Sequence, residues 1–259
     1  MVAESRRCPV DLNQGFVAVS PESVSADAWL PEGYQTVAIH EFVGVKGLLP
    51  DLVARFAKFA ARPDWRRLRR AILRRGRPGH RFFCDVDREC AKEFVRLASG
   101  SGLLNPDAFR FSASGVYVGP NALVSKEAAH FLTGDWLELF AAIQVERVQA
   151  DGPPPLGRVT ICRPWSPGVH LCEFDVLVRS GRSVLAVVEA KSSRGGFNKE
   201  ALKLAEEMGI PPERRILLRA TSSGVCVRPD STLVGISSFS DYLRRVVSNA
   251  GGCGSLMAH

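Results

Sequence analysis

The sequence predicts an α/β (α+β) protein in which a mixed sheet flanked by helices follows a smaller, mostly helical region. Three observations carry this prediction. The second half alternates helical patterns and apolar runs in the order α-β-β-β-α-β, which is typical of a sheet with helices packed on it. The first half has helical periodicity and only short apolar runs. The 259 residues are enough for one large domain or two modest ones.

We expect the chain to divide into two parts. Residues 1–120 form a basic N-terminal region that binds nucleic acid or a partner, and residues 121–259 form the mixed-sheet domain. The N-terminal region begins with two short strand patterns, at 15–20 and 34–39.

Two helices follow in the N-terminal region, one over residues 46–61 and one opened by Pro63 and Asp64. Apolar residues recur at helical spacing in both. The expected buried stripes are Leu52, Phe56 and Phe59 in the first helix and Trp65, Leu68 and Ile72 in the second.

A third helix is predicted over residues 87–104, with Asp85 and Asp87 at its start. This acidic pair indicates a helix N-cap and its neighbour rather than a metal motif. Residues 109–119 then have the pattern of a small hairpin. A helix followed by a two-stranded wing indicates a winged-helix-like unit.

Arginines cover the rest of the second helix, and two interpretations of them stand side by side. They form either a solvated face whose long side chains cover apolar surface or a face that binds phosphates. The net charge of +7 suits a polyanionic partner. The candidate nucleic-acid-binding residues on this helix are Arg66, Arg67, Arg70 and Arg74. Arg194 and Lys199, which follow the apolar run at 183–191, are further candidates.

The second half supplies the elements of the larger domain. Gly209, followed by two prolines, ends one of its helices. The predicted helices are 126–148, 198–210 and 239–250, and the predicted strands are 157–164, 170–178, 183–191 and 214–220, with a weaker strand at 225–229 or 233–237.

Three charged residues interrupt two of these apolar strands: Asp175, Glu189 and Lys191. Burying such groups costs free energy. Glu189 and Lys191 are two residues apart and share a face of the sheet. A three-residue loop of residues 179–181, with glycine in third place, puts Asp175 on that same face, opposite Leu185.

A buried pair that merely neutralises itself is the structural alternative, but such pairs stabilise poorly because desolvation offsets the attraction. Two acids and a lysine are the groups that phosphodiester hydrolysis needs. Carboxylates bind Mg²⁺ or Mn²⁺, and the bound metal acidifies water and neutralises phosphate charge. A lysine orients the attacking water or stabilises the developing negative charge.

The pattern of Asp175 followed by Glu189-Ala190-Lys191 resembles the PD-(D/E)xK signature of restriction-endonuclease-like nucleases. Residues 134–138, Gly-Asp-Trp-Leu-Glu, are similar to the GxWLE helix of CRISPR-associated nucleases that carry a CARF sensor domain. The resemblance covers residues 126–220. It implies a restriction-endonuclease-like mixed sheet.

The resemblance also implies roles. Asp175 and Glu189 would hold Mg²⁺ or Mn²⁺ with the Ala190 carbonyl, Glu138 would complete the metal site, and Lys191 would serve the water or transition state. Cys172 stands where that family often has asparagine, and Ala190 where it usually has cysteine. The roughly 120 residues before the 126–148 helix are too few and too basic for a complete CARF domain, which argues against activation by cyclic oligoadenylate.

The sequence therefore predicts a divalent-metal-dependent endonuclease, with DNA favoured over RNA, that acts as a homodimer in phage defence or a CRISPR-associated role. A structure-selective endonuclease of Holliday-junction-resolvase type and a non-catalytic nucleic-acid-binding module on a decayed nuclease fold remain alternatives.

Seven scattered cysteines without a CxxC pair predict neither disulfides nor zinc. Without a signal-peptide or membrane-spanning pattern, a cytoplasmic protein without membrane contact is expected.

Overall fold

The structure is a computed structural model that describes residues 10–252 apart from residues 13, 25, 76–79, 167–168 and 193–194. It consists of two compact units. Of the described residues, 10–12 and 46–136 form the helical unit, and 14–45 and 137–252 form the sheet unit.

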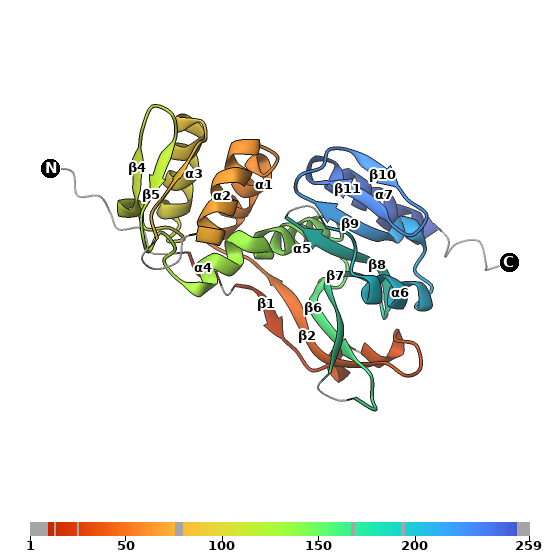
Figure 1. Ribbon diagram of the computed structural model, residues 1–259. Helices are drawn as coiled ribbons and strands as arrows, with labels where there is room; N and C mark the ends of the chain where they lie inside the picture. Colours follow the sequence, from red (N-terminus) through yellow and green to blue (C-terminus); the bar gives the residue numbers. More distant parts are fainter. Residues whose placement is uncertain are drawn as a thin grey trace. The chain divides into compact units, whose positions relative to one another are not determined.

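An eight-stranded mixed sheet is the centre of the sheet unit (Figure 1). Its strand order is β1-β2-β6-β7-β8-β9-β11-β10. The β8–β9 and β9–β11 pairs are parallel and the remaining pairs are antiparallel. The strands are β1 (Gly15–Ala18), β2 (Gln35–Gly44), β6 (Leu156–Cys162), β7 (His170–Ser180), β8 (Ser183–Lys191), β9 (Arg215–Arg219), β10 (Val225–Val227) and β11 (Thr232–Gly235).

Helices flank this sheet, which confirms the predicted fold class. Helix α6 (Lys199–Glu207) buries Ala201 and Leu204 in a core shared with β6 and β7. Helices α5 (Trp136–Val148) and α7 (Phe239–Gly252) contact each other, since the Phe140 and Phe239 rings lie 6.1 Å apart. The core beneath α6 also holds the buried strand residues Leu156, Val159, Ile161, Cys172, Phe174, Leu177 and Val187.

The division of the chain differs from the predicted boundary after residue 120. Strand β2 pairs with β6, and β1 pairs with β2, so residues 14–45 belong to the sheet unit. The physical reason is that β2 is long and amphipathic and covers the edge of β6. Ile39 of β2 is 1% exposed in the common core. This pairing joins residues more than a hundred positions apart, which sequence pattern alone does not reveal.

The helical unit combines short helices with a three-stranded sheet in the order β3-β5-β4. Helix α3 is followed by the antiparallel β4–β5 pair, and a winged-helix-like unit stays a prediction. The elements are α1 (Leu49–Phe59), α2 (Pro63–Arg75), β3 (Phe82–Cys84), α3 (Arg88–Gly100), β4 (Phe109–Phe111), β5 (Val116–Val118) and α4 (Lys126–His130), and a π-helical turn (Phe131–Asp135) leads into α5.

The predicted stripes form the core of the helical unit. Trp65 stands edge-on to both Phe56 and Phe94, with ring centroids 5.7 and 5.0 Å apart. Only Phe59 of the two stripes is half-buried; the other five residues are buried. Asp87 caps α3 by accepting a hydrogen bond from the Cys90 amide at 2.7 Å, as its position predicts.

Among the described residues, the helices are all too short or too polar to cross a bilayer.

The assignment of β2 to the sheet unit makes a stability prediction. Ile39→Ala should lower the free energy of unfolding by about 2–5 kcal/mol, because it leaves a cavity in the shared core. Val37→Ala, on the same strand but 52% exposed, should change it by less than about 0.5 kcal/mol. Urea unfolding followed by circular dichroism measures both. An equally small effect for both variants would contradict the packing of β2.

Candidate active site

The loop between β7 and β8 differs from the predicted three-residue loop. Ser180 pairs with Ser183, so the loop contains two residues, Gly181 and Arg182. Gly181 has a φ of +59°, a conformation that glycine adopts without steric cost. A two-residue loop by itself would turn Asp175 away from the face of Glu189.

A β-bulge restores the shared face. Leu185 is an extra residue in β8, between two successive pairs of the ladder. One extra residue shifts the register by one position and so moves later side chains to the other face. The ladder then runs to the pair Val176–Val188, and the next position brings Asp175 beside Glu189. The predicted placement opposite Leu185 is therefore wrong, and the acids are closer than predicted.

Asp175 is fixed across the two strands by the backbone. Its Oδ2 accepts a hydrogen bond from the Ala190 amide at 2.7 Å. The paired ladder stops at Val176–Val188, so a side chain satisfies this amide in place of a strand carbonyl. The contact orients the half-buried Asp175 carboxylate toward the end of β8.

Glu189 is the most deeply buried acid of the group, with 3% of its surface exposed. Its Oε1 forms an ion pair with the Lys191 ammonium. Its Oε2 is buried and makes no hydrogen bond of good geometry among the described residues, although the Asn198 amide lies near enough to this acid to lower its pKa. A buried, unsatisfied carboxylate oxygen is costly. The Lys191 side chain is 36% exposed, so the ion pair extends from the buried Glu189 carboxylate to the protein surface.

Glu138 comes from α5 and is held by an arginine that the sequence analysis did not identify. Its Oε2 accepts a hydrogen bond from Arg158 Nε at 3.2 Å. Arg158 has a φ of +50°, which is uncommon for a residue with a side chain. It interrupts the β6–β7 ladder between Val159 and Gly157. Arg158 therefore stands in register with Asp175.

The pKa values show that these groups interact. Burial raises the pKa of Asp175 well above its usual range, and the charges of Glu189 and Glu138 raise it further, against Lys191 and the Ala190 amide. Burial also raises the pKa of Glu189, opposed mainly by Lys191. Burial lowers the pKa of Lys191, but the bond to Glu189 and the nearby acids outweigh it, and the net shift is upward. The site carries excess negative charge that a proton or a cation would relieve.

The donor set fits a hard divalent cation in its chemistry, since Mg²⁺ and Mn²⁺ prefer carboxylate oxygens. The Glu189 Oε2, which makes no hydrogen bond of good geometry, is available to coordinate a metal ion. In the described residues, however, no group of three or more His, Cys, Asp or Glu side chains converges closely enough to hold a metal. Lys191 and Arg158 hold two of the acids, so the acids would have to turn from these partners to share an ion. The role of the Ala190 carbonyl stays a prediction.

The predicted nucleic-acid-binding residues lie in both units. Arg67, Arg70 and Arg74 are exposed at helical spacing along α2 of the helical unit, and Arg66 is half-buried there. Lys199 is exposed at the first residue of α6 in the sheet unit. Arg194 lies outside the described residues. Binding by these residues stays a prediction.

Arg158 is the site residue that the sequence reasoning missed. It falls within a segment that sequence pattern predicts as an ordinary strand. Neither residue type nor apolar spacing signals a positive φ at a non-glycine residue. Only the tertiary pairing of Arg158 with Glu138 on α5 reveals its place.

No protein-family model and no curated protein matches this chain. Two similar solved structures show the fold. Protein VC1899 from Vibrio cholerae is 13% identical with a TM-score of 0.50, over 84% of this chain and 58% of that one. Can2 from Sulfobacillus thermosulfidooxidans, in complex with cyclic tetra-adenylate, is 13% identical with a TM-score of 0.52, over 83% of this chain and 58% of that one. The alignments thus include little more than half of either solved chain.

The raised pKa of Asp175 makes a stability prediction. Its folded pKa exceeds the unfolded value of about 3.9, so ionising it opposes folding as pH rises through the folded pKa. Asp175→Asn removes this cost and should raise the Tm at pH 8, by about 2–4 °C for each kcal/mol removed. The gain should vanish as pH falls toward the unfolded pKa. Thermal scans at several pH values, without metal, measure it.

Glu206→Gln, at an exposed position of α6, is the matched control and should leave the Tm unchanged. A lower Tm for Asp175→Asn at pH 8 would contradict the unfavourable ionisation of Asp175.

Proposed function

We propose that the chain is a divalent-metal-dependent nuclease that hydrolyses phosphodiester bonds, with DNA preferred over RNA. The observation that carries the proposal is the arrangement of Asp175, in the middle of β7, beside Glu189 and Lys191 at the end of β8. Glu138 is near enough to raise the pKa of Asp175. A buried acid and a half-buried acid beside a lysine are expensive as structure alone and suit phosphodiester hydrolysis.

In this proposal Asp175, Glu189 and Glu138 would hold Mg²⁺ or Mn²⁺, with the Ala190 carbonyl as a further ligand. When bound, the metal would supply an acidified water and neutralise charge on the scissile phosphate. The hydrogen bond from the Ala190 amide would keep the Asp175 carboxylate in one orientation.

Lys191 is the proposed positioning group for the reacting atoms. Its ammonium is tied to buried Glu189 yet partly exposed, so it can approach a substrate while its own orientation is fixed. It would orient the attacking water or stabilise the negative charge that develops on the phosphate. Its raised pKa keeps it protonated at neutral pH, as this role requires.

The fold likeness to Can2 supports the proposal together with the resemblance of the sequence motifs to CARF-linked CRISPR-associated nucleases. A CRISPR-associated or phage-defence role and a homodimeric enzyme are part of the proposal on that analogy. Cyclic tetra-adenylate is the ligand of Can2. We do not include it as an activator, because the likeness extends over only 58% of Can2.

Cleavage assays test the proposal. Labelled single-stranded DNA, duplex DNA, RNA and four-way junctions are incubated with Mn²⁺, Mg²⁺ or EDTA, with and without cyclic tetra-adenylate. We expect cutting with Mn²⁺ or Mg²⁺, none with EDTA, and no dependence on the cyclic nucleotide. Lys191→Ala should slow cleavage by about 10²–10³-fold, as loss of one transition-state donor does.

Asp175→Asn and Glu189→Gln should be at least as slow, while Glu206→Gln should cut like the wild type. Cutting in EDTA, or equal activity of the wild type and Lys191→Ala, would refute the proposed mechanism. The second outcome would favour a non-catalytic binding module, and cutting of junctions alone would assign a resolvase-like substrate.

The pH dependence of cleavage should reflect the raised carboxyl pKa values of Asp175 and Glu189. At limiting Mn²⁺ the rate should rise as pH increases through these pKa values, because only ionised acids hold the metal. Saturating Mn²⁺ should move the inflection to lower pH, since binding favours the ionised form. An inflection that does not move with metal concentration would contradict metal binding by these acids.

A further inference from the structure

The positive charge of the chain is concentrated in the helical unit. Residues 46–136 contain 17 Lys and Arg against 9 Asp and Glu, a net charge of +8, whereas the whole chain carries +7. The rest of the chain is therefore close to neutral. A unit with this charge attracts polyanions over a long range, and the question is which of its surfaces makes the contact.

One face of the three-stranded sheet carries a row of aromatic and basic side chains. Phe83 of β3 pairs with Tyr117 of β5, which pairs with Arg110 of β4. Cross-strand partners lie side by side on one face. Phe83 is 39% exposed and Tyr117 is 56% exposed, and their rings lie 4.9 Å apart. The neighbours that alternate with them on the other face, such as Val116 and Val118, are buried.

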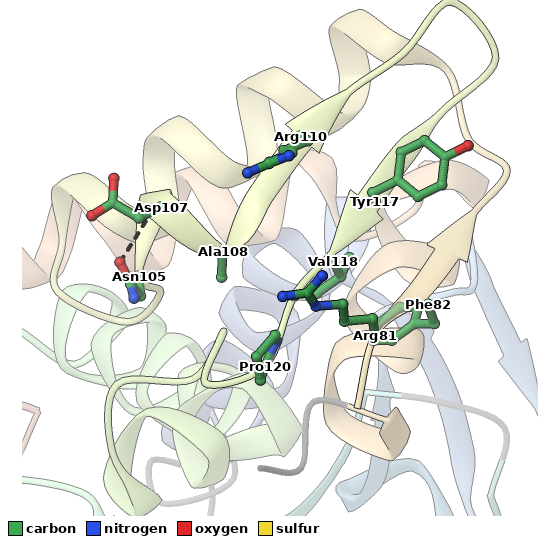
Figure 2. A pocket seen from close by; sticks show the side chains of 10 residues that line it. Arg81, Phe82, Asn105, Asp107, Ala108, Arg110, Tyr117, Val118 and Pro120 are labelled. Carbon is green, nitrogen blue, oxygen red and sulfur yellow. Dashed lines mark hydrogen bonds between the residues drawn. The ribbon is translucent and has the colours of Figure 1, made fainter. Parts of the chain in front are cut away.

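A hollow of about 570 Å³ adjoins this row: Arg110 and Tyr117 of the row line it, together with Phe82 and Val118. Figure 2 shows Asn105 and Asp107 on one side of it and Tyr117 on the other, with the Arg81 and Arg110 side chains between. Arg81, which directly precedes β3, is exposed and lines the hollow.

Small residues keep the hollow open. Gly119 and Ala108 line it, and the Gly119 amide donates a hydrogen bond to the Ala108 carbonyl at 2.6 Å. Neither residue can fill the space between the two guanidinium groups. The volume lies within the range of small-molecule sites and suits a nucleotide.

We propose that this sheet face binds single-stranded nucleic acid, with a backbone phosphate between Arg81 and Arg110 and bases stacked on Tyr117 and Phe83. Guanidinium groups match phosphate oxygens, and exposed aromatic rings on a sheet are platforms for unpaired bases. Binding here needs neither the carboxylates of the sheet unit nor a metal. The inference therefore goes beyond the proposed cleavage chemistry and stands apart from it.

Charge and geometry favour a single strand over a duplex. Bases in a duplex stack on one another, so their faces cannot reach Tyr117, whereas an unpaired base can lie flat on the ring. Asp107 also lines the hollow, so two positive groups and one negative group surround it.

Fluorescence anisotropy of labelled single-stranded DNA, with the full chain in EDTA, tests the proposal. EDTA prevents metal-dependent cleavage, so the binding measurement can be interpreted even if the nuclease proposal fails. Tyr117→Ala should weaken binding by about 10- to 100-fold, as loss of base stacking does, and Tyr117→Phe, which keeps the ring, should bind nearly as the wild type. Val124→Ala, at another exposed apolar residue of the unit, should have no effect.

Two further variants test the hollow. Ala108→Leu should weaken binding by filling it. Arg110→Gln should weaken binding and reduce the slope of log affinity against log salt by about one, as loss of a phosphate contact does. Photo-crosslinking of the wild type should attach the nucleic acid to a peptide containing Phe83 or Tyr117. Circular dichroism verifies that each variant is folded.

Wild-type affinity in both Tyr117→Ala and Ala108→Leu would overturn the proposal, as would tighter binding of a duplex than of a single strand. Self-association that Tyr117→Ala abolishes without changing nucleic-acid affinity would overturn it too, because the aromatic face would then be a contact between copies of the chain.

Discussion

The burial of Glu189 is the constraint on which the candidate active site depends. Its carboxylate is almost fully enclosed, one oxygen meets the Lys191 ammonium, and the other makes no hydrogen bond of good geometry within the described chain. A fold selected for stability alone would replace such a group with an apolar side chain of similar size. The β-bulge at Leu185 brings Asp175 beside it. The sheet thus concentrates negative charge at one place.

Two basic groups offset part of that negative charge. Lys191 comes from the same strand as Glu189, and Arg158 reaches Glu138 from β6. A guanidinium and an ammonium can neutralise carboxylates as a divalent cation does, but they also bind phosphate. In the proposed enzyme, Lys191 and Arg158 would release the acids to the metal and bind the substrate phosphate instead.

The parts of the fold that sequence predicted are those set by local pattern. Apolar spacing located helices α1, α2, α3 and α6 and strands β6 to β9, and the position of Asp87 identified its N-cap. Long-range pairing was not predictable: β1 and β2 contain no signal that they join a sheet begun more than a hundred residues later. At the candidate site, residue type and order singled out Glu138, Asp175, Glu189 and Lys191, whose roles stay predictions. The predicted length of the loop between β7 and β8 was wrong because composition gives no sign of a β-bulge. Arg158 was missed because its partner, Glu138, is on another element.

Binding of Mn²⁺ in the absence of nucleic acid tests the central claim most directly, because it involves the acids alone. Electron paramagnetic resonance measures free Mn²⁺ as protein is added. The account predicts saturable binding by the wild type and by Glu206→Gln, and its loss in a folded Glu189→Gln variant. No binding by the wild type, or the same affinity in Glu189→Gln, would contradict the claim that this buried carboxylate exists to hold a metal.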